Sequence, residues 1–253
     1  MELIASGRTA EVFAWADGQV LKLDRPEWNG LSAFEASALA RIADTGIPAP
    51  RAHREVTVGG RHGVVLDRVD GPSLAQVLDD DADASSSARR FVDLQRALNG
   101  HVVYGLPDLI IGLEDGIRAS SLDPSTVADL LMVLDHLDDG RRCLCHFDLH
   151  PGNVIVTTAG WVVIDWLTAS SGPPDADFAR TLVLGAWAAP VVPGTFTDHV
   201  LQQGLAARRL EMTRLHAWIR VIAGARLAEG FGGAEAAFMR SLASGEQRLA
   251  PDG

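Results

Sequence analysis

The chain has 253 residues, 47% of them apolar, and a formal net charge of −11. This acidity argues against a nucleic-acid partner, because binding to the phosphate backbone requires a positive surface. No apolar run is long enough to span a bilayer, and the N-terminal residues lack the pattern of a secretory signal, so we expect a cytoplasmic protein without membrane contact.

The two cysteines, Cys143 and Cys145, lie two positions apart on a strand-like run. A rigid extended backbone places such a pair poorly for a disulfide. A Cys-x-Cys-His zinc site is the alternative, but no further spaced ligands complete it. The pair therefore favours two buried strand cysteines in a reducing compartment.

The first third of the chain has the pattern of a small antiparallel sheet with one helix. A helix is predicted over Ser32–Arg41, and Gly59-Gly60 is typical of a hairpin turn. The chain then leaves this region through Asp67–Pro72, which has the composition of a connector. Strands are predicted at Leu3–Ala5, Glu11–Ala14, Val20–Leu23, Arg54–Val58 and Gly63–Leu66.

The remainder is mainly helical, since its apolar residues recur at intervals of three and four. The run Asp79–Asp83 followed by Ser85–Ser87 is interpreted as a solvated loop that ends in a helix N-cap. Helices are predicted at Ala88–Leu98, Ser125–Leu137, Asp177–Ala188, Thr195–Ala206 and Thr213–Glu229.

The segment from His146 to Asn153 has the order and spacing of a phosphoryl-transfer loop. Such a reaction needs one carboxylate to accept the proton of the acceptor hydroxyl and separate oxygen ligands for magnesium on the nucleotide phosphates. Asp148 is the candidate base, and Asn153, five residues later, is a candidate metal ligand. A buried His and Asp that stabilise a β-turn are the alternative.

A second metal ligand, Asp165, follows a predicted hairpin. Strands at Val154–Thr158 and Trp161–Ile164, joined by the turn Ala159-Gly160, bring Asp165 back beside Asn153. The two halves of the motif together predict an ATP- and Mg²⁺-dependent kinase of small molecules.

The runs His146-Phe147-Asp148-Leu149-His150-Pro151-Gly152-Asn153 and Ile164-Asp165-Trp166 resemble the aminoglycoside phosphotransferase family and its kinase-like relatives. Protein kinases usually carry a Lys where this chain has His150, and Asp-Phe-Gly where it has Asp165-Trp166-Leu167. These departures favour a small-molecule acceptor. His146 is expected to orient the loop, whereas His150 either faces the γ-phosphate or packs the turn. The resemblance also implies a structural role for Asp177 as a helix N-cap.

The resemblance implies further nucleotide-binding residues. Lys22 is expected to bind the α- and β-phosphates and to pair with Glu35 on the next helix. Gly7 is the one glycine retained in the loop expected to approach phosphate, and an ordinary hairpin turn is the alternative there.

The hinge backbone is expected to recognise adenine through the carbonyl of Asp67 and the amide of Val69, with Ile155 beneath the base. Acceptor-binding residues and the number of subunits are not determined by the sequence.

We therefore expect an α+β, two-lobed protein-kinase-like fold, with a small antiparallel β-sheet N-lobe over 1–66, a hinge over 67–72 and a larger, mainly helical C-lobe over 73–253. The predicted function is transfer of the γ-phosphate of ATP to a hydroxyl of a small molecule, such as an aminoglycoside or another antibiotic. The alternatives are a kinase-like regulatory protein that binds nucleotide without transfer, and a protein kinase.

Overall fold

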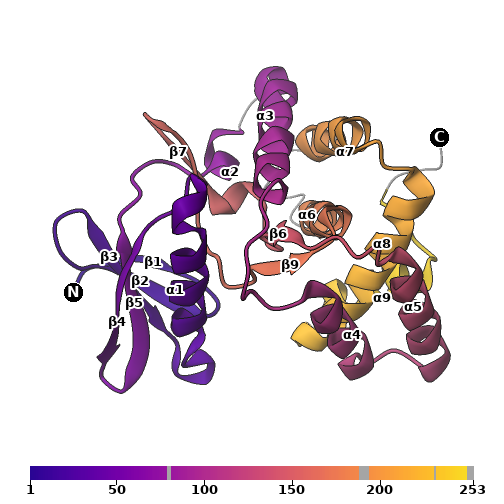
Figure 1. Ribbon diagram of the computed structural model, residues 1–253, viewed down its shortest axis with the longest axis horizontal. Helices are drawn as coiled ribbons and strands as arrows, with labels where there is room; N and C mark the ends of the chain where they lie inside the picture. The colour runs from indigo at the N-terminus through magenta and orange to yellow at the C-terminus, as the bar shows by residue number, and fades with distance from the viewer. Residues whose placement is uncertain (79–80, 188–193, 231, 250–253) are drawn as a thin grey trace. The chain divides into compact units, whose positions relative to one another are not determined.

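Five antiparallel strands open the chain in the computed structural model, which describes residues 1–78, 81–187, 194–230 and 232–249 (Figure 1). They belong to a first structural unit made of residues 1–77, 103–106 and 151–169, and the rest of the chain forms a second unit. The grouping of 151–169 with the sheet differs from the lobe division 1–66, 67–72 and 73–253, which stays a prediction.

The sheet of the first unit has the order β1-β2-β3-β5-β4. Its helix α1, Leu31–Ile42, packs against β3, β4 and β5. Gly59 and Gly60 have φ values of 59° and 80°, the left-handed conformation that a two-residue hairpin turn requires. The strands are β1 Leu3–Ser6, β2 Ala10–Ala14, β3 Gln19–Asp24, β4 Ala52–Val58 and β5 Arg61–Asp67.

Alternation along β3 separates an apolar face from a charged one. Leu21 and Leu23 are buried in a cluster with Val65, whereas Lys22 lies on the opposite face of the strand. At the end of β3, the buried carboxylate of Asp24 accepts a hydrogen bond from Ser32 Oγ at 3.0 Å. This contact fixes the start of α1 relative to the sheet.

The hairpin of the first unit consists of β7, Val154–Thr157, and β8, Gly160–Val163. Its last cross-strand pair joins Thr157 to Gly160, so the connecting residues are 158 and 159. The predicted turn at Ala159-Gly160 is therefore wrong by one residue. The Thr157 hydroxyl donates to the Gly160 carbonyl at 2.8 Å and closes the turn in this register.

The second unit is mainly helical, with one short strand pair (Figure 1). Helix α3 begins at Asp81, earlier than predicted, so residues 81–87 are helical rather than a loop. Helices α4 and α9 were not predicted, and residue 188, the predicted end of α6, lies outside the described residues. The elements are α3 Asp81–Asn99, α4 Leu109–Ala119, α5 Pro124–Leu137, β6 Cys143–Cys145, β9 Ser170–Gly172, α6 Pro174–Trp187, α7 Gly194–Arg208, α8 Met212–Arg226 and α9 Gly233–Ser244, and the first unit adds α2 Leu74–Val77.

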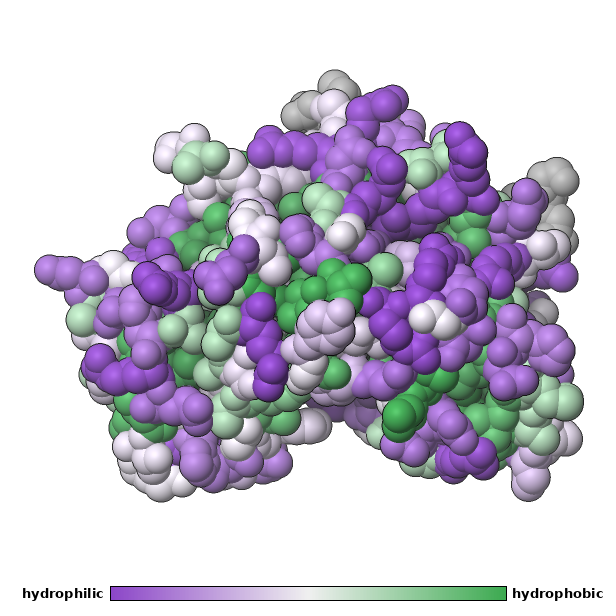
Figure 2. All heavy atoms as spheres, in the orientation of Figure 1, coloured by the Kyte–Doolittle hydropathy of each residue, from purple (hydrophilic) through white to green (hydrophobic). Residues whose placement is uncertain are grey.

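The face shown in Figure 2 is mostly hydrophilic, and its apolar side chains appear in separate groups. Tyr104, Ile111 and Met132 are among the large apolar residues that are exposed. Scattered exposed apolar residues are ordinary on protein surfaces. Within the part of the chain that the structure describes, no helix is both long and apolar enough to cross a membrane.

Candidate active site

The ammonium of Lys22 lies between two carboxylates in the first unit. Its Nζ is 2.7 Å from Glu35 Oε2 and 2.8 Å from Asp165 Oδ1. Burial alone would lower the pKa of Lys22, but the charges of Glu35 and Asp165 outweigh it and hold that pKa above its usual value. Lys22 therefore stays charged. Burial raises the pKa of Glu35 above its usual value, although the charge of Lys22 opposes this.

The backbone at Asp165 is held in an uncommon conformation. Asp165 has φ 65°, in the left-handed region that non-glycine residues rarely adopt. The next residue, Trp166, is fully buried, and its backbone N–H donates to Glu35 Oε1 at 3.1 Å. Helix α1 thus contacts both the lysine and the loop that carries Asp165, so the surrounding contacts maintain this backbone geometry.

Asn153 and Asp165 flank the β7–β8 hairpin, and pairing of its strands brings their backbones together. The N–H of Ile164 donates to the carbonyl of Asn153 at 3.0 Å. Asn153 is buried, and the Asp165 carboxylate contacts Lys22. Carboxylate and amide oxygens are the hard ligands that Mg²⁺ prefers.

No group of three or more His, Cys, Asp or Glu residues suited to a metal occurs among the described residues. Magnesium bound together with nucleotide phosphates needs only one or two protein carboxylates. The donor set at Asn153 and Asp165 therefore fits a cation that arrives with a nucleotide.

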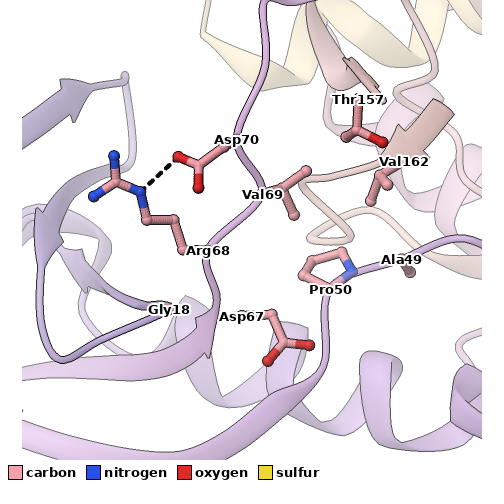
Figure 3. A pocket seen from close by; sticks show the side chains of 9 residues that line it. All are labelled: Gly18, Ala49, Pro50, Asp67, Arg68, Val69, Asp70, Thr157 and Val162. Atoms are coloured by element: carbon pink, nitrogen blue, oxygen red, sulfur yellow. Dashed lines mark hydrogen bonds and ion pairs between the residues drawn. The ribbon is translucent and has the colours of Figure 1, made fainter. Parts of the chain in front are cut away.

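A hollow of about 480 Å³ lies beside the predicted hinge (Figure 3). Asp67 and Val69 both line it, as do Arg68 and Asp70, whose side chains contact each other at 2.7 Å. Within the described ranges, no residue accepts a hydrogen bond from the Val69 N–H. An amide in this state is suited to binding an acceptor atom of a ligand.

Ile155 does not line this hollow but packs against the hinge at Gly71. Gly71 has φ 149°, and a Cβ there would overlap the carbonyl oxygen of Val156, so only glycine fits. The Val156 N–H donates to the carbonyl of Pro72 at 2.9 Å. Hinge and hairpin are thus joined by backbone contacts.

Gly7 lies in the β1–β2 connection, where its N–H donates to the Ala10 carbonyl at 2.9 Å. Its carbonyl accepts from Arg25 Nε at 3.0 Å. Both backbone groups of Gly7 are thus used within the first unit, one in the turn and one by Arg25 after β3, and its φ is not positive. The arrangement is that of a hairpin turn, and contact of Gly7 with phosphate stays a prediction.

Asp148 belongs to the second unit, in the loop that follows β6. Its N–H donates to Nδ1 of the buried His146 at 3.3 Å, which requires the proton of a neutral imidazole to be on Nε2. His146 therefore contacts the loop in the way an orienting residue would. His150 Nε2 lies 4.0 Å from Asp148 Oδ2, too far for a hydrogen bond, so both interpretations of His150 stay open.

A buried carboxylate holds the backbone just before Asp148. Asp177 Oδ1 accepts a hydrogen bond from the Phe147 N–H at 2.8 Å, and Phe147 has φ 60°. The predicted N-cap role of Asp177 is wrong, because α6 begins at Pro174 and Asp177 is its fourth residue. Asp177 instead stabilises the loop conformation through this contact.

The residues that support Asp177 were not predicted from the sequence. They are polar side chains packed between helices, three buried and Arg208 half-buried, and spacing alone does not distinguish them from surface residues. The only signal is that two of them occur four positions apart on one helix. The four supporting residues are Gln95, Asn99, Thr181 and Arg208.

The sequence model of the phosphotransferase enzyme family (APH) matches residues 1–218. The chain belongs to this family. Among curated proteins, no sequence is a significant match. Membership confirms the predicted resemblance and the prediction of an enzyme, a small-molecule kinase.

Solved structures show the fold of this phosphotransferase. An aminoglycoside-3'-phosphotransferase of type VIII is 20% identical, with 88% of this chain and 91% of that chain covered and a TM-score of 0.64. The amicoumacin kinase hAmiN, in complex with AMP-PNP, Ca²⁺ and Ami, is 14% identical over 98% and 89%, with a TM-score of 0.67. A thermostable mutant of aminoglycoside phosphotransferase APH(4)-Ia, in ternary complex with AMP-PNP and hygromycin B, is 14% identical over 96% and 91%, with a TM-score of 0.70. The predicted two-lobed, kinase-like α+β fold is thereby confirmed.

Proposed function

We propose that this protein transfers the γ-phosphoryl group of ATP, bound with Mg²⁺, to a hydroxyl of a small molecule. The observation that carries the proposal is the contact of Lys22 with both Glu35 and Asp165. A buried lysine fixed between two carboxylates is positioned to bind phosphate oxygens while one carboxylate serves a cation.

The nucleotide half of the reaction uses residues of the first unit. Lys22 binds the α- and β-phosphates, Glu35 orients Lys22, and the backbone of Asp67 and Val69 binds adenine in the hollow beside the hinge. Asn153 and Asp165 hold Mg²⁺, which neutralises charge on the phosphate oxygens. We also propose that the reaction takes place in the cytoplasm, where ATP is supplied.

The acceptor half uses Asp148. Its carboxylate accepts the proton of the acceptor hydroxyl as the oxygen bonds to the γ-phosphorus and the bond from that phosphorus to the ADP oxygen breaks. His146 and Asp177 hold the loop so that the Asp148 carboxylate keeps its orientation.

The names of the structural neighbours support an aminoglycoside or another antibiotic as the first acceptors to test. One neighbour is an aminoglycoside-3'-phosphotransferase, one is an amicoumacin kinase, and one was solved with hygromycin B. Because all three neighbours are at or below 20% identity, the acceptor of this chain is to be identified by testing a panel of compounds.

The test is Mg²⁺-dependent ADP release by the purified protein against a panel of hydroxyl-bearing compounds that includes aminoglycosides and other antibiotics. Release stimulated by one compound, with a phosphorylated product seen by mass spectrometry, supports the proposal and identifies the acceptor. Binding of ATP without stimulation by any compound favours the regulatory alternative, and phosphorylation of a generic protein substrate favours a protein kinase.

A further inference from the structure

Helices α3, α6 and α7 of the second unit pack against one another (Figure 1). Polar side chains from the three helices form a hydrogen-bonded network. Gln95 and Asn99, one turn apart on α3, are both buried. Gln95 Nε2 lies 3.1 Å and Asn99 Nδ2 lies 2.9 Å from Asp177 Oδ2. Their amide oxygens both accept from one nitrogen of Arg208, Nη2, at 3.1 and 3.0 Å.

The order of these groups fixes the direction of every hydrogen bond. A carboxylate only accepts and a guanidinium only donates, whereas an amide has one end of each kind. With Arg208 on one side and Asp177 on the other, each amide has a single orientation that satisfies both neighbours. Without the donor at Arg208, the two buried amide oxygens would lose this hydrogen-bond partner, and the Gln95 and Asn99 side chains would no longer be held from α7.

The network reaches the backbone on both sides of Asp148. Asp177 uses Oδ2 for the two amides and Oδ1 for the Phe147 N–H, at 2.8 Å. Gln95 Nε2 also donates to Thr181 Oγ1 at 3.0 Å, and that hydroxyl donates to the Leu149 carbonyl at 2.9 Å. The residues before and after Asp148 are thus held through groups that depend on the amide orientation.

Arg208 is itself held in place. Its guanidinium carbon lies 4.9 Å from the centroid of the Phe178 ring, within the range of a cation–π contact. Phe178 is fully buried and directly follows Asp177 on α6. Helix α6 therefore supplies both the Asp177 carboxylate and the Phe178 ring that holds Arg208 beside the two amides.

We propose that Arg208 is a positioning residue for the transfer reaction, which orients the Gln95 and Asn99 amides so that Asp177 holds the backbone at Asp148. Arg208 acts through these side chains and touches neither nucleotide nor acceptor. The kinetic consequence rests on the proposed function, whereas the effect on the loop does not.

The test compares Arg208→Met with Arg209→Met, the loss of a neighbouring, exposed arginine. Hydrogen–deuterium exchange of peptides that cover residues 144–149 measures loop protection directly. We expect faster exchange there in Arg208→Met, and no change in Arg209→Met. With the acceptor found in the panel, kcat should fall at least tenfold in Arg208→Met while KM for ATP stays within twofold, since misplacement of a catalytic group lowers the rate without weakening nucleotide binding.

Arg208→Lys provides a rescue that also covers the case in which Arg208→Met does not fold. One nitrogen of Arg208 serves both amide oxygens, so a lysine ammonium with three donors can replace it. We expect Arg208→Lys to recover most of the loop protection and kcat.

Unchanged exchange at 144–149 in a folded Arg208→Met protein would overturn the inference, as would faster exchange spread evenly over the second unit. If no compound stimulates the wild-type enzyme, the proposed function fails, but the exchange experiment still decides the role of Arg208.

Discussion

The carboxylate of Glu35 accepts a hydrogen bond from the backbone N–H of Trp166, although the two residues are 131 positions apart. Its other oxygen contacts Lys22. One side chain on α1 therefore fixes both the lysine and the loop of the candidate metal ligand, and its removal should affect folding and nucleotide binding together.

Glu35→Gln is expected to lower the free energy of unfolding by about 2 kcal/mol, because a buried charge-assisted contact is lost. The affinity for ATP should fall in the same variant. Urea unfolding and calorimetric titration with ATP measure the two effects. Glu55→Gln, on the exposed side of β4, is the control and should change neither by more than about 0.5 kcal/mol. Equal stability of both variants would contradict the structural role of Glu35.

Asp165→Ala is expected to abolish the dependence of ATP binding on Mg²⁺, since the variant lacks the carboxylate that fits the cation. Titration with ATP in the presence of Mg²⁺ or of EDTA measures this dependence. Asp44→Ala removes an exposed carboxylate of the first unit away from the hinge and should retain it. Tight Mg²⁺-dependent binding in Asp165→Ala would rule out the metal role.

Asp148→Asn should keep ATP affinity within about twofold and lower kcat by about 10²- to 10⁴-fold, because an amide cannot accept the hydroxyl proton. Steady-state kinetics with the acceptor from the panel and nucleotide titration measure the two quantities. Wild-type turnover in this variant would exclude Asp148 as the base.

Two glycines on helices of the second unit should respond to alanine in opposite directions. A Cβ at Gly204 on α7 would overlap the ring of the buried Phe178, so Gly204→Ala should destabilise the protein by about 1–3 kcal/mol. Gly112 on α4 has no neighbour within 4 Å of the Cβ position, so Gly112→Ala should stabilise it by about 1 kcal/mol through helix propensity. Thermal unfolding of both variants tests the pair, and a stabilising Gly204→Ala would contradict the close contact between α6 and α7.

The candidate base and metal ligands could be proposed from sequence because their residue types are concentrated in two short runs. Strand alternation is a similarly local pattern, since Lys22 lies between Leu21 and Leu23 and so faces away from both. Helix α4 was missed because its first turn, Leu109-Ile110-Ile111, is β-like and two glycines follow. One of them, Gly116, allows α4 to approach Ala225 on α8, with the Cβ position only 3.0 Å from that side chain.

The role of Asp177 was misassigned for a different reason. An N-cap is a local interaction, which sequence patterns describe well, whereas the partners of Asp177 come from α3 and from the loop after β6. Contacts between residues about 30 to 80 positions apart arise only when the helices pack. Residues such as Arg208 therefore become visible only in the folded structure.

The pairing of β7 with β8 restricts how this chain can change in length. Side chains alternate between the two faces of a hairpin, so one inserted residue within a strand would turn Val162 and Val163 to the wrong faces and shift Asp165 away from Asn153. A paired insertion, one residue in each strand, would keep the alternation. Extra sequence is best accepted at residues 158 and 159, which lie outside the paired register. A reporter peptide or a fluorophore attached at this turn would lie near the proposed nucleotide site and would leave the candidate metal ligands in position.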